Sequence, residues 1–327
     1  MIVACNNNIK EIQYSGFTID AVYACGGQLV WEKEPTPPEP YCSQYLTFVP
    51  TENCTFKLID NSGYRYSLDS GATWTSINGG GSVSVNVGEK ICWKRVVSST
   101  GKTGSMLNSY SGTVGRYEIE GNIMSIVYGD NFIGQTSLNG RAYGLFEGLF
   151  FGASGMTSAE NLCLPATTLS SGCYRNMFYD CNNLITPPKV LPANALISQC
   201  YENMFAHCES LTTAPDILAT SFVSGINASV SCCNQMFLYC TSLTKSPRIR
   251  IREDITASQA ESQFNGMFEE CHSLNEIYCL ISGNIGTSHT DNFSKNVASS
   301  GVFHKNQNST WTSGIDGIPS NWTVVNE

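Results

Sequence analysis

The feature that most constrains this chain is a short motif that recurs with nearly constant spacing. "CYRNMFYDCNNL" begins at Cys173, and "CYENMFAHCESL" begins at Cys200. Aligned on the aromatic residue of the central dipeptide, five copies fall at Phe150, Phe178, Phe205, Phe237 and Phe268. Intervals of about 20 to 50 residues are typical of stacked supersecondary units, so we expect repeats that bury one core between them.

The cysteines of each copy are spaced so as to share one side of the segment that carries them. Cys173, Met177 and Cys181 follow one another at intervals of four residues, which predicts a common helix face. Two cysteines eight residues apart on a helix lie about 12 Å from each other, too far for a disulfide between them. The repeats hold no C-x-x-C pair that would favour zinc. We therefore expect buried free thiols, with disulfides between neighbouring repeats as the alternative.

The residues expected to form the repeat core are Cys173, Met177, Phe178, Cys181, Cys200, Met204, Phe205, Cys208, Met236, Phe237, Met267 and Phe268.

Composition narrows the range of partners. The chain has 327 residues, 14% of them charged, a net charge of -9 and 15 cysteines. An acidic chain without a concentrated basic face is not expected to bind nucleic acid. We expect neither a membrane span nor a signal peptide, because no long apolar run occurs and the first residues lack a basic segment followed by an apolar one. Without export, the thiols are expected to stay reduced.

Changes of pattern along the chain predict five segments. We expect a β anchor module at 1–34, a proline-rich linker at 35–40, a β-sandwich-like domain at 41–114, repeats at 115–276 and a cap at 277–327. Alternating apolar residues separated by glycines, in the first and third segments, are typical of short strands joined by turns. The predicted fold class is therefore α+β, with small all-β modules followed by a capped solenoid of repeats.

One basic stretch is a candidate contact surface. Arg248, Arg250 and Arg252 alternate with isoleucines in "RIRIRED", so we expect them to share the solvent face of a strand. Guanidinium groups in such a row can bind carboxylates of an acidic glycan or of a protein. The alternative is a face that only confers solubility.

The remaining motifs do not predict catalysis. Residues 67–74, "SLDSGATW", match the Asp-box pattern S-x-D-x-G-x-x-W of sialidase propellers, which predicts a structural hairpin turn because the chain contains only one copy. No pair of carboxylates is marked as converging, and no nucleophile set or phosphate-binding glycine pattern is present. We expect no enzymatic activity, no metal and no cofactor.

The repeats resemble the BspA-like leucine-rich repeat proteins of gut Bacteroidetes and their crAss-like phages. The resemblance rests on "LPATTLSSGCYRNMFYDCNNLITPP" (164–188) and "CYENMFAHCESLTTAPDILA" (200–219). It extends to "GRYEIEGNIMSIVYGDNF" (115–132) and to "VASSGVFHKNQNSTWTSGIDGIPSNWTVV" (297–325), while two repeats carry insertions that depart from the pattern. The resemblance implies a leucine-rich-repeat solenoid used for adhesion or scaffolding.

The N-terminal "IKEIQYSGFTIDAVYACGGQLVWEKE" looks like the attachment module that opens virion proteins of such phages. Its candidate anchor residues are Tyr14, Phe17, Tyr23 and Trp31. The resemblance implies a non-enzymatic virion protein, a head or tail fibre or a capsid decoration subunit, assembled in the host cytoplasm. Its N-terminal module would attach to capsid or tail proteins, and the chain would form a homo-oligomer that displays the repeats to host glycans or surface proteins. The alternatives are a bacterial cell-surface adhesin and a capsular-polysaccharide depolymerase.

Overall fold

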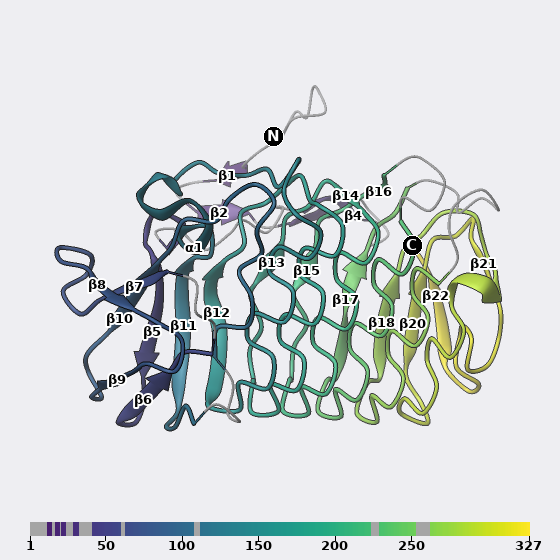
Figure 1. Cartoon of the computed structure of the whole chain (residues 1–327). Coiled ribbons are helices and arrows are strands. Elements are labelled where there is room, and N and C mark those ends of the chain that lie inside the picture. The colour runs from purple at the N-terminus through teal and green to yellow at the C-terminus, as the bar shows by residue number, and fades with distance from the viewer. Residues whose placement is uncertain are drawn as a thin grey trace.

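The computed structural model describes residues 41–59, 63–107, 112–223, 229–252 and 262–327, together with four short strands within residues 12–32. Small sheets follow one another along the body of the molecule (Figure 1). The helical elements of the described part are short: α1 (Ser125–Tyr128), η1 (Tyr41–Ser43), η3 (Gly129–Asn131) and η4 (Thr287–His289).

The N-terminal strands form two antiparallel pairs. β1 (Ile12–Tyr14) pairs with β2 (Phe17–Ile19), and β3 (Ala21–Tyr23) pairs with β4 (Leu29–Glu32). The four candidate anchor residues lie on these strands, but their side chains and the linker at 35–40 fall outside the described part of the chain.

A six-stranded sheet forms one end of the body (Figure 1). In order across the sheet, its strands are β12 (Met156–Cys163), β11 (Tyr117–Asn122), β5 (Leu46–Pro50), β10 (Ile91–Lys94), β7 (Tyr64–Ser67) and β8 (Thr75–Ile77). A separate pair, β6 (Cys54–Lys57) and β9 (Ser82–Val85), buries alternate residues of β9 as the sequence pattern requires. Because β11 pairs with both β5 and β12, one sheet continues across the boundary expected at 114/115.

Successive repeats, and the segment at 277–327 that was expected to be the cap, pair through short parallel strands. The two-stranded sheets are β13 (Val190–Leu191) with β15 (Asp216–Ile217), β14 (Ala195–Leu196) with β16 (Ser221–Phe222), and β19 (Asn284–Ile285) with β21 (Thr310–Trp311). A four-stranded sheet joins β17 (Lys245–Ile249), β18 (Glu276–Cys279), β20 (Val302–Lys305) and β22 (Thr323–Asn326). These strands define the strand side of the repeats.

The predicted fold class, α+β with a capped leucine-rich-repeat solenoid, is wrong. The secondary-structure elements of the described chain are mostly β-strands in several small sheets, with one short α-helix. The segments expected to be repeat helices are runs of turns. Within one repeat, every fourth residue adopts a positive φ, including Asn176 at 54° and Asp180 at 59°. Backbone N–H groups alternate between partners: Met177 donates to Tyr174 of its own repeat, and Phe178 donates to Met204 of the next. We call this part of each repeat the turn side.

The spacing of the cysteines explains the error. A period of four residues fits a helix, but it fits a run of four-residue turns equally well. Asn and Asp tolerate the left-handed region that closes each turn, and Asn176 and Asp180 stand at two such positions.

Phenylalanine rings from successive repeats form one column in the core. The rings of Phe150, Phe178, Phe205, Phe237 and Phe268 are fully buried, and neighbouring centroids lie 5.5, 5.3, 5.6 and 5.8 Å apart. The methionines and cysteines of the expected repeat core are also fully buried: Met177, Met204, Met236, Met267, Cys173, Cys181, Cys200 and Cys208. This stacking gives the repeats a continuous interior.

The second cysteine of each repeat donates a hydrogen bond to a backbone carbonyl in that interior. The Cys181 thiol donates to the carbonyl of Phe150 at 3.1 Å, and the Cys208 thiol donates to the carbonyl of Phe178 at 3.1 Å. Two later cysteines repeat the contact one repeat further along each time: Cys240 to Phe205 and Cys271 to Phe237. A small apolar side chain with a weak donor therefore fills the core and partners a buried carbonyl. Burial raises the pKa of Cys181 to about 12.

The cysteines of the repeated motif are free, as expected, but the expectation that all thiols stay reduced is wrong. Cys42 in η1 and Cys163 at the end of β12 form a disulfide across 121 residues of sequence. The other described cysteines are free and buried.

Replacing one ring of the phenylalanine column is expected to destabilise the protein. Phe205→Ala removes the ring between Phe178 and Phe237, so both neighbours lose a stacking partner. We expect a loss of about 3 to 5 kcal/mol in the free energy of unfolding, measured by urea denaturation. Phe151→Ala, at a partly exposed ring, serves as the control and is expected to cost clearly less; equal losses would contradict the column's role.

Candidate ligand-binding surface

The structure separates the three arginines that the sequence placed on one strand. Arg248 lies in β17, but that strand ends at Ile249, so Arg250 and Arg252 follow it. Ile249 and Ile251 are buried as the alternation requires. The Arg248 guanidinium lies 4.8 Å from the ring centre of Tyr278, its register partner in β18. The Arg248 side chain therefore packs on a tyrosine ring of the same chain.

The surroundings of Tyr278 form a dense internal network. His304 stacks on the Tyr278 ring at 3.9 Å, and the Tyr278 hydroxyl donates to Glu276 at 2.6 Å. Lys245 lies 3.2 Å from the Glu276 carboxylate. Although burial raises the pKa of Glu276, the hydrogen bonds from Tyr278 and Lys245 outweigh it and bring the pKa below its ordinary value. These contacts make the network a stabilising feature of the sheet.

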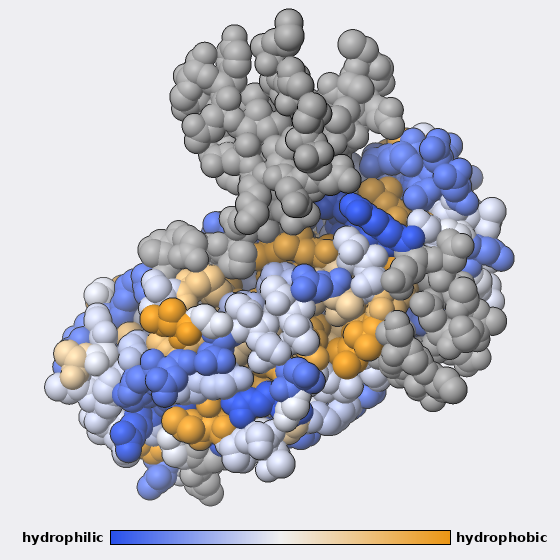
Figure 2. Space-filling view, turned by 90° about the horizontal axis from the view of Figure 1, so that it is seen from above, coloured by the Kyte–Doolittle hydropathy of each residue, from blue (hydrophilic) through white to orange (hydrophobic). Residues whose placement is uncertain are grey.

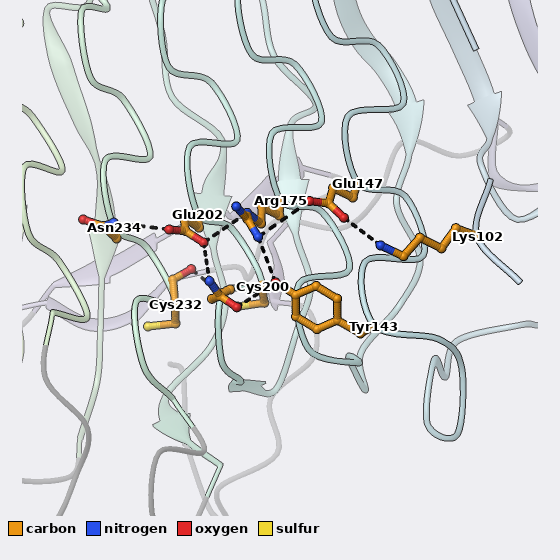
Figure 3. A network of polar contacts seen from close by, with 9 residues as sticks. Lys102, Tyr143, Glu147, Arg175, Cys200, Glu202, Cys232 and Asn234 are labelled. Carbon is orange, nitrogen blue, oxygen red and sulfur yellow. Dashed lines mark hydrogen bonds and ion pairs between the residues drawn. The ribbon is translucent and has the colours of Figure 1, made fainter. Parts of the chain in front are cut away.

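A row of charged side chains runs along the turn side of the repeats (Figure 3). Arg175 lies between two carboxylates, 3.6 Å from Glu147 and 3.3 Å from Glu202. Lys102 extends the row by donating to Glu147 at 2.9 Å, and Asn234 extends it by donating to Glu202 at 3.4 Å. Donors and acceptors from successive repeats are therefore held in fixed order, with charges of alternating sign.

A row of aromatic side chains also crosses these repeats, one or two residues after each phenylalanine of the core column. Its rings are Phe151, Tyr179, His207 and Tyr239, with successive centroids 4.9, 5.2 and 4.9 Å apart. Tyr239 is 40% exposed. Because Phe151 stacks on Tyr179 and His207 stacks on Tyr239, the row supports the turn side as well as reaching solvent.

A pocket of about 450 Å³ opens on the strand side of the first repeats. Three charged residues line it: Glu160 in β12, Asp216 in β15, and Lys189, which directly precedes β13. The Lys189 ammonium lies 3.1 Å from the Glu160 carboxylate, and both side chains are 49% exposed. A volume of this size lies within the range of small-molecule sites.

The Asp-box segment forms the turn that its pattern predicts, between β7 and β8. Asp69 accepts hydrogen bonds from the Thr73 amide at 2.8 Å and from the Thr73 hydroxyl at 2.6 Å. Trp74 donates to the Gly71 carbonyl at 3.0 Å. Hydrogen bonds from Ser67 and Thr73 lower the pKa of Asp69 to about 2. All of these groups serve the turn itself.

Comparisons with models of known families, with curated proteins and with solved structures found no match to this chain. No helix in the described ranges has the length and apolar character needed to cross a bilayer. Across those same ranges, no three His, Cys, Asp or Glu side chains are grouped so as to hold a metal ion.

Sequence reasoning missed the pocket, although a signal for it was present. Lys189 directly follows Pro188, and Asp216 directly follows Pro215, one repeat later. Charged residues of opposite sign thus occupy the same place in two neighbouring repeats. Only the pairing of the strands brings Glu160 to the same opening.

Proposed function

We propose that this protein is a non-enzymatic structural protein of a phage virion, a fibre or decoration subunit that displays its repeats to the host surface. The observation that carries the proposal is a row of charged side chains at equivalent places in successive repeats, Glu147, Arg175 and Glu202, together with a row of aromatic side chains across the same repeats. The charged row and the aromatic row follow the same direction along the turn side.

A surface of this kind suits adhesion. Repeated weak contacts gain strength from multiple display, by about 10²- to 10⁴-fold over one contact. Seen from above, hydrophilic and apolar side chains intermingle on the described surface (Figure 2). Such a mixture suits ligands that offer both hydroxyl groups and carbon–hydrogen faces.

Attachment to the particle is assigned to residues 1–34. Two observations support it: the segment resembles phage attachment modules, and a proline-rich stretch separates it from the body. We also propose that the subunits associate with one another, so that several copies of the repeats face the host.

A cell-surface adhesin is the second candidate. The Cys42–Cys163 disulfide is as compatible with a cell-surface adhesin as with a virion protein. Disulfides persist in oxidising surroundings outside the cytosol. A released particle and a bacterial envelope both provide such surroundings, so the two candidates differ in where the protein is found.

Cryo-electron microscopy of purified particles tests the proposal. We expect density for this chain with residues 1–34 against a capsid or tail protein and with the repeats projecting outward. Particles that lack the chain, together with its recovery from the bacterial envelope, would replace the virion assignment with the adhesin.

A further inference from the structure

The strand-side pocket combines an apolar floor with a polar rim. Pro187 and Pro188 are buried, and with Ala214 they supply the apolar part of the lining. Glu160, Lys189 and Asp216 supply charged groups around it, and Thr186 and Thr213 complete the lining. A volume of about 450 Å³ is large enough for one or two sugar rings.

The backbone holds this lining in place. The Ala159 amide donates to the Thr186 carbonyl at 2.9 Å, and the Asp216 amide donates to the Lys189 carbonyl at 2.9 Å. The side chains of Ser158 and Thr186 hydrogen-bond at 2.6 Å. Three neighbouring chain segments are thereby fixed to one another, so a ligand meets a site that needs little ordering.

The chemistry of the lining selects a class of ligand. Carboxylates accept hydrogen bonds from hydroxyl groups, and an ammonium donates them. The carbon–hydrogen face of a sugar ring packs on proline and alanine in place of water. Two carboxylates against one lysine leave the rim with a net negative charge, which disfavours acidic sugars.

We propose that this pocket is a binding site for a neutral sugar unit of a glycan. The inference rests on the proposed adhesive function and names the ligand class for it. Glu160 and Asp216 accept hydrogen bonds from sugar hydroxyls, Lys189 donates one, and the prolines support the ring.

Two variants of the full chain test the site by different means. Thr213→Trp fills the pocket from an exposed position and keeps all three charged groups, whereas Lys189→Ala removes one donor. Matched controls come from the next repeat, at β17: Thr244→Trp is another exposed threonine, and Lys245→Ala breaks the comparable ion pair with Glu276, at 3.2 Å.

Saturation-transfer NMR with neutral mono- and disaccharides of glucose, galactose, mannose and N-acetylglucosamine provides the measurement. Sialic acid and glucuronic acid serve as acidic comparisons. We expect the neutral sugars to bind the unmodified chain, Thr213→Trp to abolish the signal, and Lys189→Ala to weaken binding about tenfold. Both control variants are expected to bind as the unmodified chain does.

Three results would overturn the inference: no neutral sugar binds, the acidic sugars bind more tightly, or Thr213→Trp binds normally. Binding of the full chain to host cells, measured in parallel, separates the two levels. If the chain binds cells but no sugar, the assignment of the pocket is wrong and the proposed adhesive function stands. If it binds sugar but no cells, the assignment of the pocket stands and the proposed adhesive function is wrong.

Discussion

Raising the pH above about 9 is expected to unfold the protein within about one and a half pH units. The cause is the set of fully buried thiols whose pKa values are raised by burial. They belong to Cys173, Cys181, Cys200, Cys208, Cys232, Cys240, Cys271 and Cys279. Circular dichroism against pH, in the presence of a reductant, measures the transition.

Stability falls as the pH rises because the folded state keeps the thiol protons to a higher pH than the unfolded state does. In the unfolded chain a thiol loses its proton near pH 8.5, whereas the folded chain keeps the Cys181 proton to about pH 12. Between those values the folded state binds more protons, so the stability that is complete below about pH 8.5 declines as the pH rises. Each thiol contributes about 1.4 kcal/mol per pH unit, and eight together contribute about 11 kcal/mol per pH unit. One pH unit therefore removes an amount comparable to the whole stability of a typical domain.

The slope of the free energy of unfolding against pH shows whether the buried thiols cause the transition. The double variant Cys208→Ala, Cys240→Ala is expected to lower the dependence of stability on pH by about one quarter, whatever it does to the midpoint. Burial also raises the pKa of Tyr174 and Tyr201, so tyrosinate absorbance is expected to rise together with unfolding. A protein that keeps its fold past pH 11 would contradict this account of the core.

Loss of the Cys42–Cys163 disulfide is expected to lower the free energy of unfolding by about 5 kcal/mol. The bond closes a loop of 121 residues, and such a closure removes much of the freedom of the unfolded chain. It also ties η1 to the end of β12, and Asn122, the register partner of Cys163 at the end of β11, donates to the Cys42 carbonyl at 2.8 Å. Urea denaturation with and without a reductant measures the change.

The variant Cys42→Ser separates this bond from other effects of the reductant. It is expected to show the lower stability under both conditions, whereas the unmodified chain falls to that level only when reduced. A midpoint that does not respond to the reductant in the unmodified chain would show that the bond does not contribute.

The sequence allowed the repeat positions to be predicted but not the conformation between them. Phe178 and Phe205 were predicted as core because they recur at repeat spacing, and both are fully buried. The helix was predicted in error because Cys173 and Cys181 share a period of four that turns also satisfy. The left-handed residues Asn176 and Asp180 carry the missing information.

Features that depend on distant parts of the chain escaped prediction. Cys42 and Cys163 have no common motif, and only the packing of η1 against β12 brings them together. The arginine row was predicted from alternation alone, which does not show that β17 ends at Ile249 or that Arg248 covers Tyr278. Both outcomes depend on strand pairing, which the local pattern does not specify.

The measurement that tests the central claim most directly is incubation of the full chain with capsular polysaccharide of the host, recording both binding and the release of reducing ends. We expect saturable binding that Thr213→Trp weakens, with no release of reducing ends over the background hydrolysis of the polymer. Steady release of sugar that is lost in Glu160→Gln or Asp216→Asn would contradict the account, because the pocket would then hold the paired carboxylates of a depolymerase.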